Sequence, residues 1–222
     1  WNLSEEVLDM YKNVYDPLRY VWHIMQMESM YIASMAPTST ITNVFIFMGM
    51  DHMRRVQRVA QRVKMLDIVY PSLGIGQDTR KTFEESPVFQ PAREALEKML
   101  VTYDIGEALV AFNLANKFVL DELLLQHLPQ LANKMDDNMM RHIHLSFYND
   151  TLRHRQQVAE LFKYAFSKDP SLKEVVKPWL KEWQEISYKA IEGFREVFKG
   201  EYDNVVKEIK KAHNEYLGGL GL

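Results

Sequence analysis

The chain has 222 residues, 27 basic and 30 acidic side chains, a net charge of −3 and no cysteine. This near-neutral balance argues against a nucleic-acid or anionic-membrane surface as the main function. The lack of cysteine excludes disulfides, thiolate metal sites and cysteine nucleophiles, and it fits a reducing cytoplasm. No apolar run approaches the roughly 20 residues that a membrane helix requires, and we recognise no signal peptide. Because the chain opens at Trp1 rather than Met, we expect its natural start to lie upstream.

The periodicity along the chain is helical almost throughout. Apolar residues recur every three or four positions, and Gly and Pro fall mostly between these stretches. Ser4, the pair Asp16-Pro17 and the cluster Asp169-Pro170-Ser171 are typical of helix starts. We expect helices over residues 4–15, 17–35, 41–69, 79–85, 90–102, 104–126, 136–167, 171–199 and 201–216. No run alternates strictly enough to predict a strand, so the expected fold class is all-α.

Long helices of this kind pack side by side as a bundle. Residues 41–50 (ITNVFIFMGM) and 106–120 (GEALVAFNLANKFVL) are apolar on nearly all sides, which is typical of helices at the centre of an assembly. Residues 172–199 have a clear polar face instead, and we expect them to cover the bundle from outside. Because no boundary divides the chain, we expect a single domain over residues 1–222.

Two five-residue motifs repeat within the long helices. Motif 1 is Asp51-His52-Met53-Arg54-Arg55, and motif 2 is Asp150-Thr151-Leu152-Arg153-His154. Helical di-iron sites use a Glu and a His three residues apart, because this spacing puts both ligands on one helix face. Motif 1 has His52 and Arg55 at these two positions, and motif 2 has Thr151 and His154. Arginine cannot bind a metal cation, so only His154 has the chemistry of a ligand.

Each of the two remaining helices of a di-iron site would have to supply one further carboxylate. The helix before motif 1 offers Glu28 and His23, and the helix before motif 2 offers Glu107, Lys117 and Glu122. We favour capping or solvated roles for the three carboxylates. Glu107, for example, lies at a helix start, where a negative charge favours the helix dipole. Metal ligation by these groups is the alternative.

The two motifs look like decayed versions of the paired Asp-Glu-x-Arg-His motifs of bacterial multicomponent monooxygenases, the soluble di-iron hydroxylases for toluene, phenol, alkenes and methane. Three longer stretches carry the same resemblance: residues 17–43, which include MAPTSTITN; residues 70–77 and 84–114, which include TYDIGEALVAFNL; and residues 175–194. The hydroxylase of this family contains an α subunit that holds the iron and a related β subunit that has lost it. This chain resembles the β subunit.

The resemblance implies a ferritin-like helical bundle with additional amphipathic outer helices and a lost metal site. It implies a non-catalytic scaffold within an enzyme that hydroxylates or epoxidises small hydrocarbons or aromatics with O2 and NAD(P)H. This chain would hold no cofactor, and the di-iron centre would belong to the partner α subunit. The implied partners are that α subunit and a small γ subunit, in a doubled αβγ assembly, with regulatory and reductase components. Only about 16 residues precede Pro17, so the N-terminal arm of such subunits is expected to be missing or shortened.

The alternative function is a ferritin-like protein that itself binds a di-metal centre with non-standard ligands such as His52, His154, Glu28 and Glu107. Arg55 argues against it, because a fixed cation occupies a ligand position. If the two motifs face each other as in the di-iron relatives, Asp51 should lie near His154 and Asp150 near Arg55. The buried Arg55 cation would then stand in for part of the lost metal charge.

Two further patterns have two interpretations each. Methionines are dense between residues 25 and 65, where we favour core filling over an adaptable binding surface. The basic run over residues 54–64 contains Val at helical intervals, so we favour a solvated amphipathic face over a surface for an acidic partner. The β-subunit resemblance also predicts a broad apolar surface on the isolated chain that includes the methionine-rich helices. His142 and His144 are two residues apart and should point to different sides of one helix.

Overall fold

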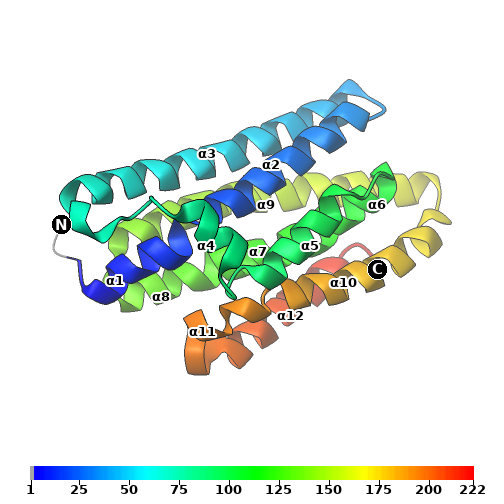
Figure 1. Cartoon of the computed structure of the whole chain (residues 1–222). Coiled ribbons are helices and arrows are strands. Elements are labelled where there is room, and N and C mark those ends of the chain that lie inside the picture. Colours follow the sequence, from blue (N-terminus) through cyan, green and yellow to red (C-terminus); the bar gives the residue numbers. More distant parts are fainter. Residues whose placement is uncertain (1–2) are drawn as a thin grey trace.

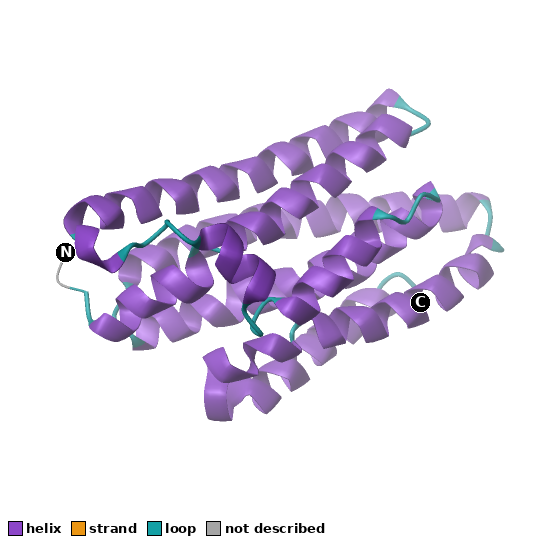
Figure 2. Cartoon of the chain, viewed as in Figure 1, coloured by secondary structure: helices purple, strands orange, loops and turns teal. Residues whose placement is uncertain are grey.

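The computed structural model describes residues 3–222, and within them the chain is a stack of helices joined by short loops (Figures 1 and 2). Trp1 and Asn2, the first residues of the expected domain, lie outside the described residues. The α-helices are α1 (Glu5–Met10), α2 (Leu18–Met35), α3 (Ser39–Val69), α4 (Thr79–Glu85), α5 (Gln90–Leu100), α6 (Ile105–Leu109), α7 (Lys117–Glu122), α8 (Leu128–Lys134), α9 (Asn138–Lys168), α10 (Leu172–Ala190), α11 (Arg195–Phe198) and α12 (Tyr202–Gly218). The π-helical turns are η1 (Tyr11–Tyr15), η3 (Val110–Asn116) and η4 (Leu123–His127), and the 3-10 turns are η2 (Pro71–Leu73), η5 (Glu192–Phe194) and η6 (Lys199–Glu201). The all-α expectation is confirmed.

Polar side chains cap the starts of four of the described α-helices, α1, α3, α6 and α9. Ser4 accepts a hydrogen bond from the backbone N–H of Val7 at the start of α1, and Asp137 accepts one from Met140 at the start of α9. Asp104 caps α6 in the same way, with 2.9 Å between its Oδ1 and the backbone nitrogen of Glu107. These bonds satisfy N–H groups that have no partner within the helix.

One predicted helix boundary is wrong. The break expected at residues 127–129 is absent, and α6, η3, α7, η4 and α8 follow one another without a gap from Ile105 to Lys134. Pro129 is tolerated because it lies in the first turn of α8, where the π-helical turn η4 has already interrupted the regular hydrogen-bond ladder. The boundary predicted between residues 15 and 17 is confirmed, because a turn at residues 16–17 separates η1 from α2, but Asp16 does not cap α2 with its side chain.

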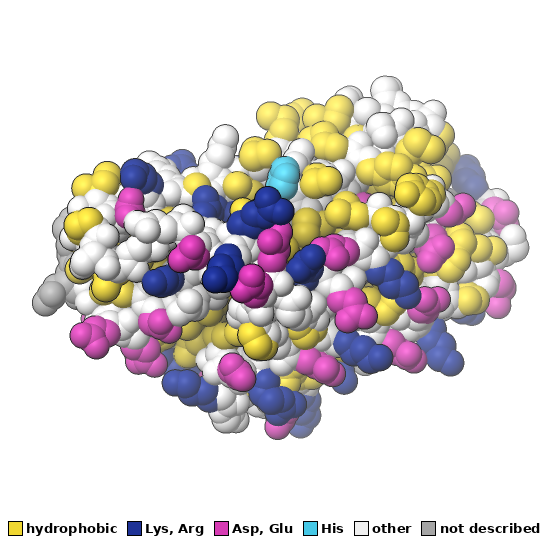
Figure 3. Space-filling view, in the orientation of Figure 1, with side chains coloured by type: hydrophobic (Ala, Val, Ile, Leu, Met, Phe, Trp, Pro, Cys, Tyr) yellow, Lys and Arg dark blue, Asp and Glu magenta, His cyan; other side chains and the backbone are white. Residues whose placement is uncertain are grey.

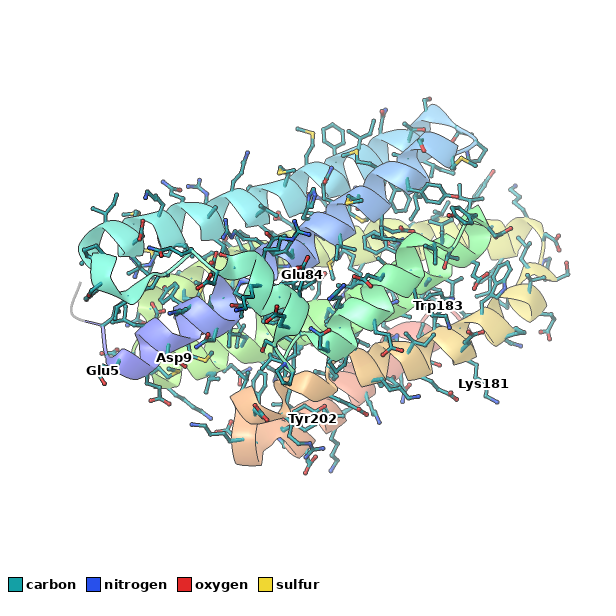
Figure 4. The ribbon with its side chains drawn as sticks, in the orientation of Figure 1. Glu5, Asp9, Glu84, Lys181, Trp183 and Tyr202 are labelled. Carbon is teal, nitrogen blue, oxygen red and sulfur yellow. The ribbon has the colours of Figure 1, made fainter. Side chains whose placement is uncertain are left out.

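The expected helix over residues 171–199 is shorter than the sequence pattern indicates. α10 ends at Ala190, and η5, α11 and η6 follow before α12 begins. Gly193 in η5 allows this turn to pack closely against the loop at residues 87–88, because a side chain there would collide with the carbonyl oxygens of Pro87 and Val88. The outer position of α10 is nevertheless confirmed. Figure 4 shows Trp183 turned towards the inner helices and Lys181 pointing away from them.

The centre of the bundle is formed by the segment from α6 to α8. Residues 110–125 are buried throughout, which confirms the expectation for residues 110–120, and the segment packs against α5, α9, α10 and α12. The expectation for residues 41–50 is wrong in part. Phe45 and Met48 are buried, but Phe47 is 62% exposed and Met50 is 58% exposed. This side of α3 therefore faces outward from the chain.

Exposed apolar side chains gather over the hairpin of α2 and α3, at the upper right of Figure 3, whereas charged side chains are dense over the lower helices. We define the α2–α3 apolar face by its exposed members Met27, Met35, Ile46, Phe47 and Met50. Core filling is thus correct for Met25 and Met48 but wrong for these exposed methionines. The expected apolar surface on the methionine-rich helices is confirmed. None of the helices among residues 3–222 is long and apolar enough to span a membrane.

Candidate functional site

The two motifs lie on α3 and α9, two helices of 31 residues each that contact each other beside the central segment. Helical spacing turns the Glu and His positions of both motifs inward, so His52, Arg55, Thr151 and His154 are all buried. The central helix α7 adds Lys117 and Asp121, which are one turn apart and also buried. Six polar side chains therefore meet inside an otherwise apolar bundle.

Arg55 is the centre of this cluster. Its Nη1 donates to Oδ1 of Asp121 at 3.0 Å, and its Nη2 donates to Oγ1 of Thr151 at 2.9 Å. Thr151 in turn donates to Oδ2 of Asp121 at 2.9 Å. The guanidinium and the carboxylate are both 0% exposed. Thr151 stands where a di-iron protein has the Glu of this motif. Its uncharged hydroxyl therefore bridges Arg55 and Asp121 and adds no negative charge.

Lys117 makes the cluster net positive. Its Nζ lies 2.5 Å from Oδ2 of Asp121, so two buried cations share one carboxylate. Burial lowers the pKa of Lys117 to about 8 although Asp121 opposes the shift. Burial would by itself raise the pKa of Asp121, but the charges of Lys117 and Arg55 hold that pKa well below its usual range. At neutral pH the group carries two positive charges and one negative charge.

His154 has a separate partner on the opposite motif. Its Nε2 lies 2.9 Å from Oδ2 of Asp51, as expected from the sequence. Burial, and after it the positive charge of Lys117, lowers the pKa of His154 to about 3. The imidazole is therefore neutral at pH 7, and its Nε2–H donates to an ionised Asp51. This contact is a hydrogen bond rather than an ion pair.

The expected pairing of Asp150 with Arg55 is wrong. Asp150 instead accepts from Arg54, the neighbouring residue of motif 1, and it also lies 3.6 Å from Arg153. Arg153 pairs in addition with Asp51. Arg55 turns inward from α3 and Asp150 lies on the rim, so the deeper Asp121 becomes the partner of Arg55. A salt-bridged row of four side chains on the rim thus lies above the buried cluster.

His52 and Glu28 are buried polar side chains with atoms that lack a hydrogen-bond partner among residues 3–222. Both ring nitrogens of His52 lack a hydrogen-bond partner among residues 3–222, and burial followed by the Arg55 charge keeps the pKa of His52 well below its usual value. Burial alone raises the pKa of Glu28 to about 8. Glu28 is therefore mostly protonated at pH 7. A solvated role for Glu28, favoured from the sequence, is wrong.

The other candidates from the sequence are dispersed. His23 and His142 are exposed, while His144 is buried, as their spacing predicts. Glu107 lies in the first turn of α6, and its Oε1 accepts from Nε1 of Trp183 at 3.0 Å. Glu122 is buried and pairs with Arg155 at 2.5 Å, so neither capping nor solvation describes it.

Sequence reasoning missed the importance of Asp121 and undervalued Lys117. Their signal is a lysine and an aspartate at i and i+4 inside the apolar run FNLANKFVLDELLL (112–125), where isolated charges are costly to bury. A pair at this spacing lies on one helix face. The pattern therefore indicates a buried ion pair.

These residues do not fit a di-iron centre. A di-iron site needs several carboxylates with imidazoles converging on two metal ions. Here a guanidinium and an ammonium group occupy the space between α3, α7 and α9, and the single carboxylate between them is already paired with both. A metal ion would be repelled by these cations and would have no free carboxylate to replace water. Among the described residues, this space is therefore filled by ion pairs and hydrogen bonds between side chains.

Several known proteins are similar to this chain in sequence. A family model described as methane/phenol/alkene hydroxylase matches residues 1–169. The β subunit of the hydroxylase component of the toluene-4-monooxygenase system of Ectopseudomonas mendocina is 34% identical over 180 residues, which are 81% of this chain. The oxygenase component DmpL of phenol 2-monooxygenase of Pseudomonas sp. strain CF600 is 25% identical over 210 residues, 93% of this chain. The chain spans 55% and 61% of the lengths of these relatives.

Two solved structures are similar as well. Toluene 4-monooxygenase with toluene bound contains a chain that matches with a TM-score of 0.84 and 31% identity, over 89% of this chain and 65% of that one. Xenon-pressurised phenol hydroxylase from Pseudomonas sp. OX1 matches with a TM-score of 0.86 over 100% of this chain and 66% of that one. At 21% identity the second match shows a shared fold only. The ferritin-like fold is thus confirmed.

Proposed function

Because this chain belongs to the methane, phenol and alkene hydroxylase family, we propose that it is the non-catalytic β subunit of a multicomponent monooxygenase hydroxylase. It serves as a scaffold for an iron-bearing α subunit that hydroxylates or epoxidises a small hydrocarbon or aromatic with O2 and NAD(P)H. Residues 1–222 form one domain of this subunit, and the protein works in the cytoplasm, where the nicotinamide reductant is available.

The observation that carries the proposal is the replacement of metal ligands by a buried ion cluster. Arg55 and Lys117 supply positive charge inside the bundle, and Asp121 and Thr151 hold that charge with hydrogen bonds. A bundle built in this way keeps the shape of a di-iron protein without its reactivity. We infer that this chain binds no iron and that the six motif positions Asp51, His52, Arg55, Asp150, Thr151 and His154 are vestigial.

The α2–α3 apolar face supports the assignment of a partner. Large exposed apolar patches on one side of a protein mark interaction sites, and permanent complexes use more hydrophobic interfaces than transient ones. We assign this face to the α subunit. A small γ subunit completes the hydroxylase, which we expect to be a doubled αβγ assembly, and regulatory and reductase components bind to that assembly.

Co-expression tests this function. The chain expressed alone should aggregate, and with its α partner it should form a stable complex that carries out NADH-dependent hydroxylation. Metal analysis of the separated chains should find iron in the α subunit and less than a tenth of an equivalent, roughly, in this chain. Near-stoichiometric iron or manganese on this chain, held by His154 with Glu28, Glu107 or Glu122, would favour the alternative of a metal-binding ferritin-like protein. A stable monomer with no affinity for an iron-bearing α subunit would disprove the β-subunit role.

A further inference from the structure

A second open surface lies away from the α2–α3 apolar face, along the line where α3 and α9 pass each other. It is a groove of about 720 Å³ lined by Leu3, Arg54, Arg58, Gln61, Arg62, Met65, Met139, His142, Ile143 and Ser146. None of the residues that define the α2–α3 apolar face belongs to it. The surface assigned to the α subunit therefore leaves this groove unexplained.

The walls of the groove are two helix faces. Arg54, Arg58 and Met65 follow one another along α3 at helical intervals, and Met139, His142 and Ser146 do so along α9. From Arg54 to Met65 the wall is about 16 Å long at 1.5 Å per residue. A channel of this length between two helices accommodates about three turns of a third helix.

The charged side chains that line the groove are all basic. Arg54 is paired with Asp150 on the rim, and Nε of Arg62 donates to the Tyr11 hydroxyl at 3.1 Å. Arg58 donates to Oε1 of Gln61 at 3.2 Å, and no carboxylate pairs with it within residues 3–222. The α3 wall thus presents an exposed guanidinium that lacks an ionic partner.

The remaining lining is largely apolar. Met65 is 41% exposed and Met139 is 55% exposed, and the partly buried Ile143 lies between the walls. A small polyanion would match the arginines but would leave these side chains in water. A helix with apolar residues on one face and acidic residues along one flank would match both.

We propose that the α3–α9 groove binds an amphipathic helix with an acidic flank, supplied by another component of the same hydroxylase. Carboxylates of that helix pair with Arg58, and its apolar residues pack on Met65, Met139 and Ile143. The proposal rests on the β-subunit function proposed above and adds a contact that the α2–α3 apolar face does not supply.

The test compares three variants of this chain, each co-expressed and purified with its hydroxylase partners: Arg58→Glu, Met139→Glu and the control Lys181→Glu. Lys181 points away from the bundle on α10, so its variant makes the same reversal of charge at a distant surface (Figure 4). Dissociation of each complex on dilution is measured by mass photometry at about 50 mM and about 300 mM salt, where screening differs strongly. Thermal melting checks that every variant is folded.

We expect the Arg58→Glu and Met139→Glu complexes to dissociate at concentrations at least tenfold higher than wild type at low salt. We expect the salt dependence of Arg58→Glu to be weaker than that of wild type, and Lys181→Glu to stay within about twofold of wild type. Equal behaviour of Arg58→Glu and Lys181→Glu would overturn the groove proposal and leave the β-subunit function intact. Binding of inorganic tripolyphosphate to the same complexes is measured by calorimetry. If Arg58→Glu loses this binding while its assembly is unchanged, the groove is a small-anion site and the groove proposal is also overturned. If the wild-type chain assembles with no hydroxylase partner, both proposals fall together.

Discussion

Motif 1 and motif 2 have the same spacing but solve the loss of metal in different ways. In motif 2, His154 keeps an imidazole and bonds to Asp51 of the opposite motif, near the rim of the bundle. In motif 1, Arg55 does not pair with Asp150, which corresponds to Asp51. Its longer side chain donates instead to Asp121 on the central helix α7. A neutral imidazole needs only one hydrogen-bond acceptor, whereas a buried guanidinium needs a carboxylate that is buried as well. The comparison predicts that the motif 1 side depends on Asp121 far more than the motif 2 side depends on its rim.

The largest effect is expected from Asp121→Asn. This change removes the carboxylate that Arg55 and Lys117 share and leaves two buried cations near each other. We expect a loss of about 3–5 kcal/mol in the free energy of unfolding, which corresponds to a melting temperature lower by roughly 6–20 °C. Thermal melting of the co-purified complex measures it. A drop of less than about 3 °C would show that the cluster is not held by this charge.

The pH dependence of the free energy of unfolding tests the burial of Lys117 in the same cluster. The pKa of its ammonium group is about 8 in the folded chain and 10.5 for a solvated lysine, so between these values only the unfolded chain holds the proton. Unfolding then takes up a proton, and stability rises with pH across this window. Against Lys117→Met, wild type should gain about 3 kcal/mol from pH 8 to pH 10.5. Parallel stability curves for the two proteins would mean that Lys117 is not desolvated.

Arg55→Met should cost less than Asp121→Asn although it removes a larger side chain. The change leaves Lys117 and Asp121 as a neutral pair, and the methionine fills most of the volume of the arginine stem. We expect a loss of about 1–3 kcal/mol, mainly from the hydrogen bonds of Thr151 and Asp121 that lose their donor. Urea unfolding or melting of the complex measures the order of the two variants. A larger loss for Arg55→Met than for Asp121→Asn would mean that the cluster depends more on Arg55 than on Asp121.

The smallest effect is expected on the rim. Asp150 pairs with Arg54 and approaches Arg153, and both arginines are more than a third exposed. Asp150→Ala should therefore change the free energy of unfolding by less than about 1 kcal/mol. High salt should reduce even this difference, because solvent ions screen exposed pairs. If Asp150→Ala lowered the free energy of unfolding as much as Asp121→Asn, the rim and the buried cluster would contribute equally to stability, contrary to this prediction.

Much of the fold could be predicted from the sequence because local patterns determine it. The period of apolar residues predicts the helices, and Ser4 and the aspartates at helix starts mark several boundaries. The exceptions depend on contacts or on turn geometry that periodicity does not record. Gly193 is required by the close approach of the loop at residues 87–88, and Pro129 does not end a helix because a π-helical turn precedes it.

The candidate site was predictable in outline only. The i, i+3 spacing places four motif residues inside the bundle, and the link between Asp51 and His154 follows from the facing motifs. The partner of Arg55 could not be predicted, because Asp121 lies on a different helix and its depth depends on how that helix packs. Likewise, periodicity shows that residues 41–50 are apolar but not whether their outer side faces the same chain or another one.

The buried cluster also changes what this chain needs from the cell before it can fold. A protein that obtains its central charges from metal ions becomes rigid only after the metal arrives, because binding and folding are coupled. Here the charges are part of the polypeptide, carried by Arg55, Lys117 and Asp121. Maturation of this chain should therefore proceed at the same rate in iron-starved and iron-replete cells. Under the proposed β-subunit function, this chain would fold before an iron-bearing α subunit is complete.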